Sequence, residues 1–210
     1  MATRPDTIAV ALSGGVDSSV AAALLREKHE VIAVHFTKFG FEGLTDDVRR
    51  RDEESLDSAR RASSHLGVPL EVVEIGGRFN ELVEFFCAEY NAGRTPNPCA
   101  LCNPTIKWPT LIETAERLGA RTVATGHYAR ILKRRGAFAL MRSPCNPKDQ
   151  TYFLHRLTQE HLALTCFPLG EMEKTEVTRH ARRLGLRTVN RSESQEICFV
   201  GDDGYASILA

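Results

Sequence analysis

Short, mostly apolar runs alternate along the chain with longer amphipathic stretches. The apolar runs at residues 8–12, 31–36, 70–75 and 122–125 are typical of buried strands. Apolar positions at helical spacing mark helices at residues 20–25, 47–67, 79–90 and 106–118. This repeated strand–helix order predicts a parallel sheet covered by helices.

The predicted fold class is therefore α/β, with a doubly wound and mostly parallel sheet. Such sheets bind ligands outside the carboxyl ends of their strands, so residues 13–19, the segment after Phe36, and Gly126-His127 are expected to meet at one nucleotide. A polar turn between two apolar flanks predicts a hairpin at residues 131–142. Two parts are expected: residues 1–160 for the nucleotide, and 161–210 as a small helical segment with a helix near 173–184.

Composition narrows the possible partners. The chain has 210 residues with 27 basic and 27 acidic side chains, so no global basic field indicates a nucleic-acid partner, and only local patches remain for one. No apolar run approaches the ~20 residues that span a bilayer, and the N-terminus lacks the core of a signal peptide. We therefore expect a cytoplasmic protein with no membrane partner.

A loop of small residues follows the first predicted strand, with the sequence Ser13-Gly14-Gly15-Val16-Asp17-Ser18-Ser19. Such a loop permits a tight turn whose backbone N–H groups point at one spot, and the N-terminus of the following helix adds to the attraction for an anion. The loop sequence matches neither of two common nucleotide-binding patterns, G-x-x-x-x-G-K-[ST] and G-x-G-x-x-G. The loop predicts a nucleotide phosphate site of another type, with a simple helix-capping turn as the alternative.

Six cysteines in a reducing compartment favour chemistry or metal binding over a disulfide framework where they are clustered, and only Cys99 and Cys102 are. They lie in a loop rich in Pro, Gly and Asn that is predicted for residues 91–103. A C-x-x-C pair is typical of half a zinc site, a redox dithiol, or thiolates for sulfur chemistry or an iron–sulfur cluster. No second pair completes a zinc site, and only Cys198 is a plausible third thiolate.

Six motifs occur in a fixed order: SGGVDSS at 13–19, GRTPNP at 93–98, LCN at 101–103, ATGHY at 124–128, KDQ with YFL at 148–154, and ICF at 197–199. In these motifs the chain resembles the bacterial and mitochondrial tRNA-specific 2-thiouridylase family. That family has the adenine-nucleotide α-hydrolase-like fold with a pyrophosphatase-type loop. The resemblance implies a sulfurtransferase that adenylates the wobble uridine of tRNA with ATP and Mg²⁺ and accepts sulfur from a persulfide or sulfide donor protein.

The resemblance also implies roles for single residues. Cys102 would be the nucleophile, Cys198 would carry the persulfide, and Asp17 would help to hold Mg²⁺ against the phosphates. The ATP site would comprise Ala11, Leu12, Ser13, Gly14, Gly15, Val16, Asp17, Ser18, Phe36 and Gly126. The target base would meet Asn97, Pro98 and Cys99, and tRNA would contact Lys148, Asp149 and Gln150.

Two departures from the family pattern leave alternatives open. Many relatives have aspartate at the position of Cys99. Thiolates at Cys99, Cys102 and Cys198 would be enough for a [4Fe–4S] cluster. The alternative is a persulfide route in which Cys99 is a bystander or a resolving thiol. The family's C-terminal β-barrel is expected to be absent, which puts tRNA affinity in doubt. Competing hypotheses are an amide-forming synthetase of the same fold and a non-catalytic nucleotide-binding or sulfur-carrying partner.

Overall fold

A five-stranded sheet organises the computed structural model, which describes residues 6–43, 45–144, 149–186, 197–201 and 204–209. Its strand order is β3-β2-β1-β4-β7. The strands are β1 (Thr7–Ala11), β2 (Glu30–Thr37), β3 (Leu70–Glu74), β4 (Thr122–Ala124) and β7 (Thr165–Cys166). Each neighbouring pair is parallel. The predicted α/β fold class is confirmed.

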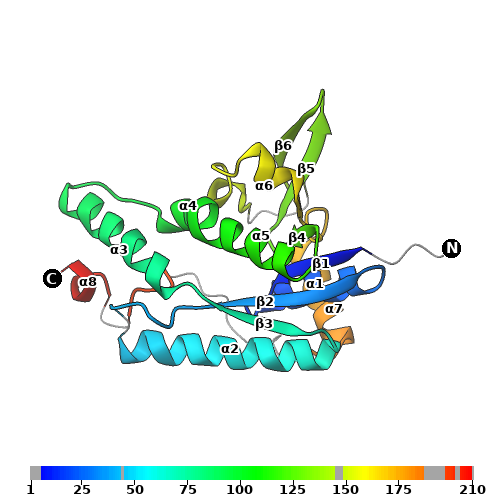
Figure 1. The fold of residues 1–210 in the computed structure, drawn as a ribbon, viewed down its shortest axis with the longest axis horizontal. Helices are drawn as coiled ribbons and strands as arrows, with labels where there is room; N and C mark the ends of the chain where they lie inside the picture. The colour runs from blue at the N-terminus through cyan, green and yellow to red at the C-terminus, as the bar shows by residue number, and fades with distance from the viewer. Residues whose placement is uncertain (1–5, 44, 145–148, 187–196, 202–203, 210) are drawn as a thin grey trace.

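Helices cover both faces of this sheet (Figure 1). On one face lie α1 (Val16–Arg26) and α2 (Asp46–Leu66), with α7 (Lys174–Arg183) packed against α1. On the other face α5 (Trp108–Arg117) packs against β1 and β4. Because both faces are covered, the strands read as nearly continuous apolar runs rather than as alternating ones.

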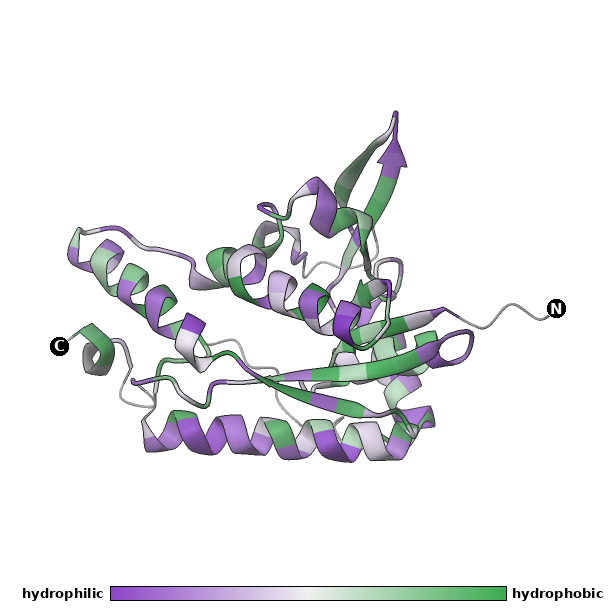
Figure 2. Cartoon of the chain, viewed as in Figure 1, coloured by the Kyte–Doolittle hydropathy of each residue, from purple (hydrophilic) through white to green (hydrophobic). Residues whose placement is uncertain are grey.

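Helix α2 shows why the sequence pattern was informative. Its buried side chains include Leu56, Ala59, Ala62 and Leu66, the positions that helical spacing singled out. The helix ends at Gly67, which adopts the left-handed conformation (φ 61°) that favours glycine at a helix C-terminus. Hydrophilic residues cover the side of α2 that faces away from the sheet (Figure 2).

The predicted hairpin is also present, as β5 (Ala129–Arg134) and β6 (Ala137–Arg142), which project from the body of the fold (Figure 1). Its two-residue turn places Arg135 and Gly136 at positive φ (48° and 84°), as a tight antiparallel hairpin requires. The hairpin begins two residues earlier than predicted. The two-residue strand β7 was not predicted, because so short a segment carries no periodic pattern.

The loop predicted for residues 91–103 is shorter than expected. Helix α3 (Gly76–Asn91) precedes it, and the short helix α4 (Pro98–Cys102) begins within it. A π-helical turn, Asn103–Lys107, then leads directly into α5, so the predicted helix at 106–118 was wrong about its first residues. Helix α4 forms within the predicted loop because the Asn97 side chain caps it and Pro98 occupies a first-turn position where no N–H is needed.

Residues beyond 160 share the core of the rest of the chain. They form α6 (Gln159–Ala163), strand β7 beside β4, helix α7 against α1, and the last described helix α8 (Ala206–Leu209), which contacts α3. A division at residue 160 stays a prediction. None of the helices within the described ranges is long and apolar enough to cross a membrane.

Candidate active site

A cavity of about 780 Å³ opens where the carboxyl ends of β1, β2 and β4 meet the segment around α4. The predicted site residues that line it are Ala11, Leu12, Ser13, Asp17, Ser18, Phe36, Asn97, Pro98, Cys99, Gly126, Gln150 and Cys198. The predicted site residues that the structure describes but that do not line the cavity are Gly14, Gly15, Val16, Cys102 and Asp149. Lys148 lies outside the described residues. The nucleotide loop and the cysteine loop therefore share one cavity.

The loop between β1 and α1 is held by its own serines. Ser18 Oγ donates to the Gly15 carbonyl (3.2 Å) and accepts from the Ser13 N–H (3.2 Å), and Ser19 Oγ also donates to Gly15 (2.8 Å). No side chain caps the first turn of α1. The unpaired N–H groups and positive dipole end of α1 are therefore left for an anion.

Helix α2 clamps the other side of this loop. Ser55 Oγ donates to the Ser13 carbonyl (2.9 Å), and Ser58 Oγ donates to the Gly14 carbonyl (2.8 Å). Gly14 has φ +75°, and a Cβ there would lie 2.7 Å from both the Ala59 nitrogen and Ser58 Cβ. Glycine is thus required at position 14 for both conformation and space.

Gly126 brings the end of β4 against the first turn of α1. A Cβ at this position would lie 2.7 Å from the Ser18 nitrogen and 2.8 Å from the Asp17 carbonyl carbon. Both contacts are to backbone, so a side chain cannot move aside to relieve them. The close approach leaves backbone rather than side chain beside the loop, as a bound phosphate or nucleoside would need.

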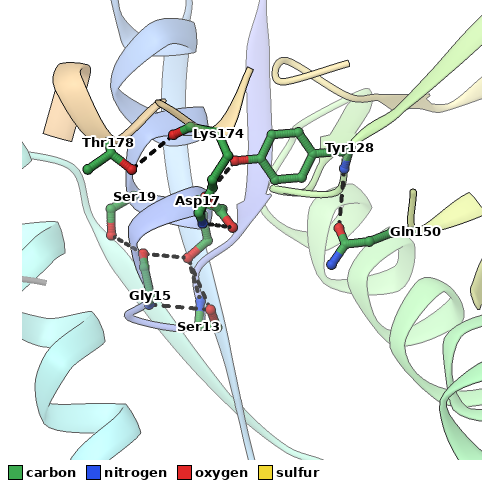
Figure 3. A network of polar contacts seen from close by, with 9 residues as sticks. Ser13, Gly15, Asp17, Ser19, Tyr128, Gln150, Lys174 and Thr178 are labelled. Atoms are coloured by element: carbon green, nitrogen blue, oxygen red, sulfur yellow. Dashed lines mark hydrogen bonds and ion pairs between the residues drawn. The ribbon is translucent and has the colours of Figure 1, made fainter. Parts of the chain in front are cut away.

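Asp17 does not point an unpaired carboxylate into the cavity. Lys174 Nζ, from the first turn of α7, donates to both carboxylate oxygens (2.7 and 2.8 Å), and the Tyr128 hydroxyl donates to Oδ1 (2.8 Å; Figure 3). The groups around Asp17 are thus donors rather than the oxygen ligands that Mg²⁺ prefers. Sequence analysis identified neither Lys174 nor the role of Tyr128.

The cysteine loop is fixed from both ends. The Asn97 side chain accepts from the Ala100 N–H (3.2 Å), and Asn103 Nδ2 donates to the Phe153 carbonyl (3.0 Å), which ties α4 to the 3-10 turn Thr151–Phe153. Cys99 is half-buried at the cavity wall, Cys102 is buried, and Cys198 is exposed. The three thiols lie close enough to influence one another electrostatically.

Burial sets the protonation of the two loop cysteines. It raises the pKa of Cys102 to about 11 and that of Cys99 above its usual value, while the positive charge of Lys107 acts in the opposite direction on both. Both side chains are therefore thiols at neutral pH in this conformation. A nucleophilic thiolate at either position needs further stabilisation.

The three predicted iron–sulfur ligands do not form a metal site in this structure. Within the described ranges, which include Cys99, Cys102 and Cys198, no group of three or more His, Cys, Asp or Glu side chains is placed to hold a metal ion. The donor set is present in the sequence, and an iron–sulfur cluster on it stays a prediction.

Two further residues line the cavity: His127, which was expected beside Gly126, and Lys107, which was missed. His127 packs against the rings of Trp108 and Phe167, and its Nδ1 lies 2.8 Å from Thr125 Oγ1. Burial, aided by the charge of Lys107, lowers its pKa to about 3, so its ring is neutral. Lys107 lines the cavity at the end of the π-helical turn. In the sequence, only its position five residues after Cys102 indicates that Lys107 could belong to the site.

His35 is a third such residue. It is 2% exposed, its Nδ1 lies 2.7 Å from the Leu12 carbonyl, and its Nε2 has no hydrogen-bond partner among the described residues. Burial lowers its pKa, so the ring is neutral, with Nδ1–H as the donor to Leu12. Nε2 is left as an acceptor in a side chain that lines the cavity.

The chain has close relatives among characterised protein families. It is 47% identical over 204 residues to the tRNA-specific 2-thiouridylase MnmA of Syntrophotalea carbinolica, and 46% identical over 210 residues to that of Geobacter metallireducens. Each alignment covers 96% of this chain and 57% of the relative. The chain thus spans little more than half the length of the curated relatives it matches.

Solved structures show the same fold at low sequence identity. A glutamine-dependent NAD⁺ synthetase from Acinetobacter baumannii has a TM-score of 0.53 at 18% identity, covering 91% of this chain and 33% of the synthetase. A predicted subunit of tRNA methyltransferase from Methanocaldococcus jannaschii has a TM-score of 0.51 at 15% identity, covering 84% and 75%.

The resemblance to 2-thiouridylases that the six motifs indicated is confirmed by these sequence relatives. The family described as the tRNA methyl transferase HUP domain matches residues 6–202, which is nearly the whole chain. The chain belongs to the tRNA methyl transferase HUP domain family.

Proposed function

We propose that this chain uses ATP to activate O2 of the wobble uridine in tRNA and replaces that oxygen with sulfur. The observation that carries the proposal is the shared cavity, in which Ser13 and Asp17 of the anion-binding loop face the same space as Cys99 and Cys198. Relatives named 2-thiouridylases support the same reaction. A synthetase that joins ammonia to a carboxylate would need the loop but would leave the thiols without a role.

The first step is activation of a poor electrophile. The uridine O2 attacks the α-phosphorus of ATP, the bond to the bridging oxygen breaks, and pyrophosphate leaves, so that C2 carries AMP as a leaving group. The first turn of α1 would bind the pyrophosphate, and Gly126 admits the nucleotide close to the backbone. Seven of the ten ATP residues implied by the resemblance line the cavity, which supports this role. The surroundings of Asp17 do not fit a protein-held Mg²⁺, and we assign the metal ion no step.

Sulfur transfer follows. A donor protein passes sulfane sulfur to Cys198, which becomes a persulfide. Either its terminal sulfur attacks C2 and expels AMP, after which Cys102 attacks Cys198 Sγ, or Cys102 attacks first and releases hydrosulfide, which then attacks C2. Both orders form a Cys102–Cys198 disulfide and supply two electrons, and a cellular thiol reductant must restore the pair. The cytoplasm provides such reductants.

Cys99 is not needed as a redox partner in this route. We favour the persulfide route because it needs only the two thiols of Cys102 and Cys198. Asn97, Pro98 and Cys99 would then contact the target base at the cavity wall. Gln150, whose Oε1 accepts from the Tyr128 N–H (3.3 Å), and Asp149, bound to Thr151, would contact the tRNA together with Lys148.

The experiment that tests the proposal follows AMP release and 2-thiouridine formation with tRNA, ATP and a donor protein that carries a persulfide. Cys102→Ser and Cys198→Ser are expected to stop thiolation but to retain ATP binding, because activation and sulfur transfer use different groups. Cys87→Ser, on α3 and absent from the cavity wall, is the matched control.

The outcomes separate the alternatives. AMP release that depends on a carboxylate and ammonia rather than on tRNA would identify an amide-forming synthetase. ATP binding without AMP release under either condition would identify a non-catalytic partner. Thiolation at the wild-type rate in either active-site serine variant would overturn the role given to that cysteine.

A further inference from the structure

Lys107 occupies an unusual place in the backbone. It ends the π-helical turn Asn103–Lys107, in which the Trp108 N–H donates to the Asn103 carbonyl, five residues back. In such a turn, residues five apart lie over one another, whereas in an α-helix they lie on different faces. Cys102 directly precedes this turn. The wider turn therefore places Lys107 on the same side of the helix as Cys102.

Proline explains why the turn is wide. Pro109 has no N–H, and in a regular α-helix its ring would crowd the carbonyl four residues earlier, that of Thr105. A π-helical turn relieves such crowding, and π-helical turns inside helices occur frequently at functional sites. The distortion has a definite result here, because it directs a lysine into the cavity.

The surroundings of Lys107 contain no acidic partner. Within the part of the chain that the structure describes, no carboxylate or carbonyl accepts a hydrogen bond from Nζ, and the charges that act on it are those of Cys102, Cys198 and Cys99. Burial opposes its charged form, whereas negative charge on these three sulfurs favours it and raises the pKa of Lys107 above the ordinary value. Among the described residues, the groups whose charge acts on Lys107 are thus all cysteine sulfurs.

The two loop cysteines do not supply this negative charge at rest. Burial keeps Cys99 and Cys102 protonated, and His127 is neutral. A partly enclosed cation without a counter-ion is unfavourable, so the site favours the entry of an anion. A persulfide is a stronger acid than its parent thiol, and hydrosulfide is anionic near neutral pH; both are anions that Cys198 chemistry would place here.

We propose that Lys107 binds the anionic sulfur that attacks the activated base, holding it beside Cys102 and Cys198. This inference rests on the proposed function and adds a residue that touches the reacting sulfur. The bound species is the terminal sulfur of the Cys198 persulfide or the hydrosulfide released from it. Lys107 takes part in no covalent step; it holds the negative charge until C2 accepts the electron pair and AMP leaves.

The test compares an anionic and a neutral alkylating reagent on the free protein. Iodoacetate and iodoacetamide attack the same thiolate, so the ratio of their rates at Cys198, followed by mass spectrometry, cancels differences in thiolate population. Lys107→Met is expected to lower the iodoacetate-to-iodoacetamide ratio about fivefold relative to wild type. Lys107→Arg should stay within about twofold of wild type, because it keeps the positive charge.

Cys87 serves as an internal control, because it lies on α3 outside the cavity wall, and its ratio should not change. Circular dichroism confirms that each variant is folded, and Lys107→Gln provides a second neutral substitution. An unchanged ratio in folded Lys107→Met and Lys107→Gln would overturn the proposal. This measurement needs neither ATP nor tRNA, so it fails or succeeds independently of the proposed thiolation.

A turnover experiment then identifies the sulfur species. With tRNA and ATP, Lys107→Met should keep AMP formation and lose most sulfur transfer; equal thiolation by this variant and wild type would overturn the proposal. Supplying sulfide to Cys198→Ser protein separates the two sources. Thiolation that requires Lys107 under these conditions identifies hydrosulfide as the bound anion, and thiolation confined to protein with Cys198 identifies the persulfide.

Discussion

Lys174 Nζ lies 2.7 and 2.8 Å from the two carboxylate oxygens of Asp17, although 157 residues separate them in sequence. Their side chains are 27% and 25% exposed, so solvent screens the pair only in part. The contact joins the first turn of α7 to the first turn of α1. It neutralises a carboxylate that would otherwise repel phosphates at the N-terminus of α1.

The first prediction follows from this pair. Lys174→Met leaves the Asp17 charge uncompensated beside the loop, so the affinity for ATP should fall about tenfold, or ~1.4 kcal/mol, in isothermal titration calorimetry. The double variant Asp17→Asn with Lys174→Met removes both charges and should recover most of the affinity. If the double variant binds as weakly as the single one, Asp17 has a direct role with the nucleotide or its metal ion.

Gly126→Ala tests the close approach of β4 to α1. The added Cβ would lie 2.7 Å from the Ser18 nitrogen, and crowding of this kind costs about 1–3 kcal/mol of folding free energy. We expect a lower midpoint in urea unfolding together with a loss of ATP binding. Gly77→Ala on α3 is the control, because no atom lies within 4 Å of its Cβ. Equal effects of the two substitutions would contradict this account.

Local patterns explain what could be predicted. The buried strands, the stripe of Leu56, Ala59 and Ala62 on α2, and the hairpin all depend on neighbouring residues, and the sequence carries that information directly. The glycines of the phosphate loop were recognisable for the same reason. Their conformational requirement is local: Gly14 needs positive φ within a single turn.

Long-range partners and distorted helices could not be predicted. Nothing near Lys174 in the sequence indicates that it reaches Asp17, because only the parallel sheet order brings α7 to α1. The one-residue widening at Asn103–Lys107 changes which face Lys107 occupies, and regular helical periodicity gives the wrong face. The iron–sulfur hypothesis rests on the three cysteines of the sequence and stays a prediction.

Tyr152 is expected to support an RNA base at the cavity mouth. Its ring is 53% exposed, lines the cavity and packs on Phe153 with ring centroids 3.9 Å apart, so the aromatic surface is held in place. Single-stranded RNA bases stack on such side chains, each stacked base contributing about 1–3 kcal/mol. Tyr152→Ala should therefore weaken binding of an anticodon stem-loop at least about fivefold in fluorescence anisotropy, and Tyr152→Phe should not.

The control for this prediction is Phe85→Ala, which removes a 44% exposed ring on α3 outside the cavity wall. Its RNA affinity should match that of wild type. If both alanine variants weaken binding equally, the effect reflects general loss of apolar surface, and Tyr152 has no special place at the site.

The last prediction concerns acid stability. His127 packs against Trp108 and Phe167 with Lys107 nearby, and desolvation lowers its pKa to about 3 from 6.5. A depressed pKa means that the unfolded chain binds the proton more readily, so the contribution to stability is present above about pH 6.5 and is lost as pH falls toward 3. At about pH 4.5 the loss should reach roughly 2–3 kcal/mol in urea unfolding.

The control is His127→Gln, whose side chain cannot titrate. Between about pH 6.5 and 4.5, the free energy of unfolding of wild type should fall more steeply than that of the variant. The carboxylates common to both chains cancel in this difference. Parallel curves for the two proteins would show that His127 takes up its proton without cost in the folded chain.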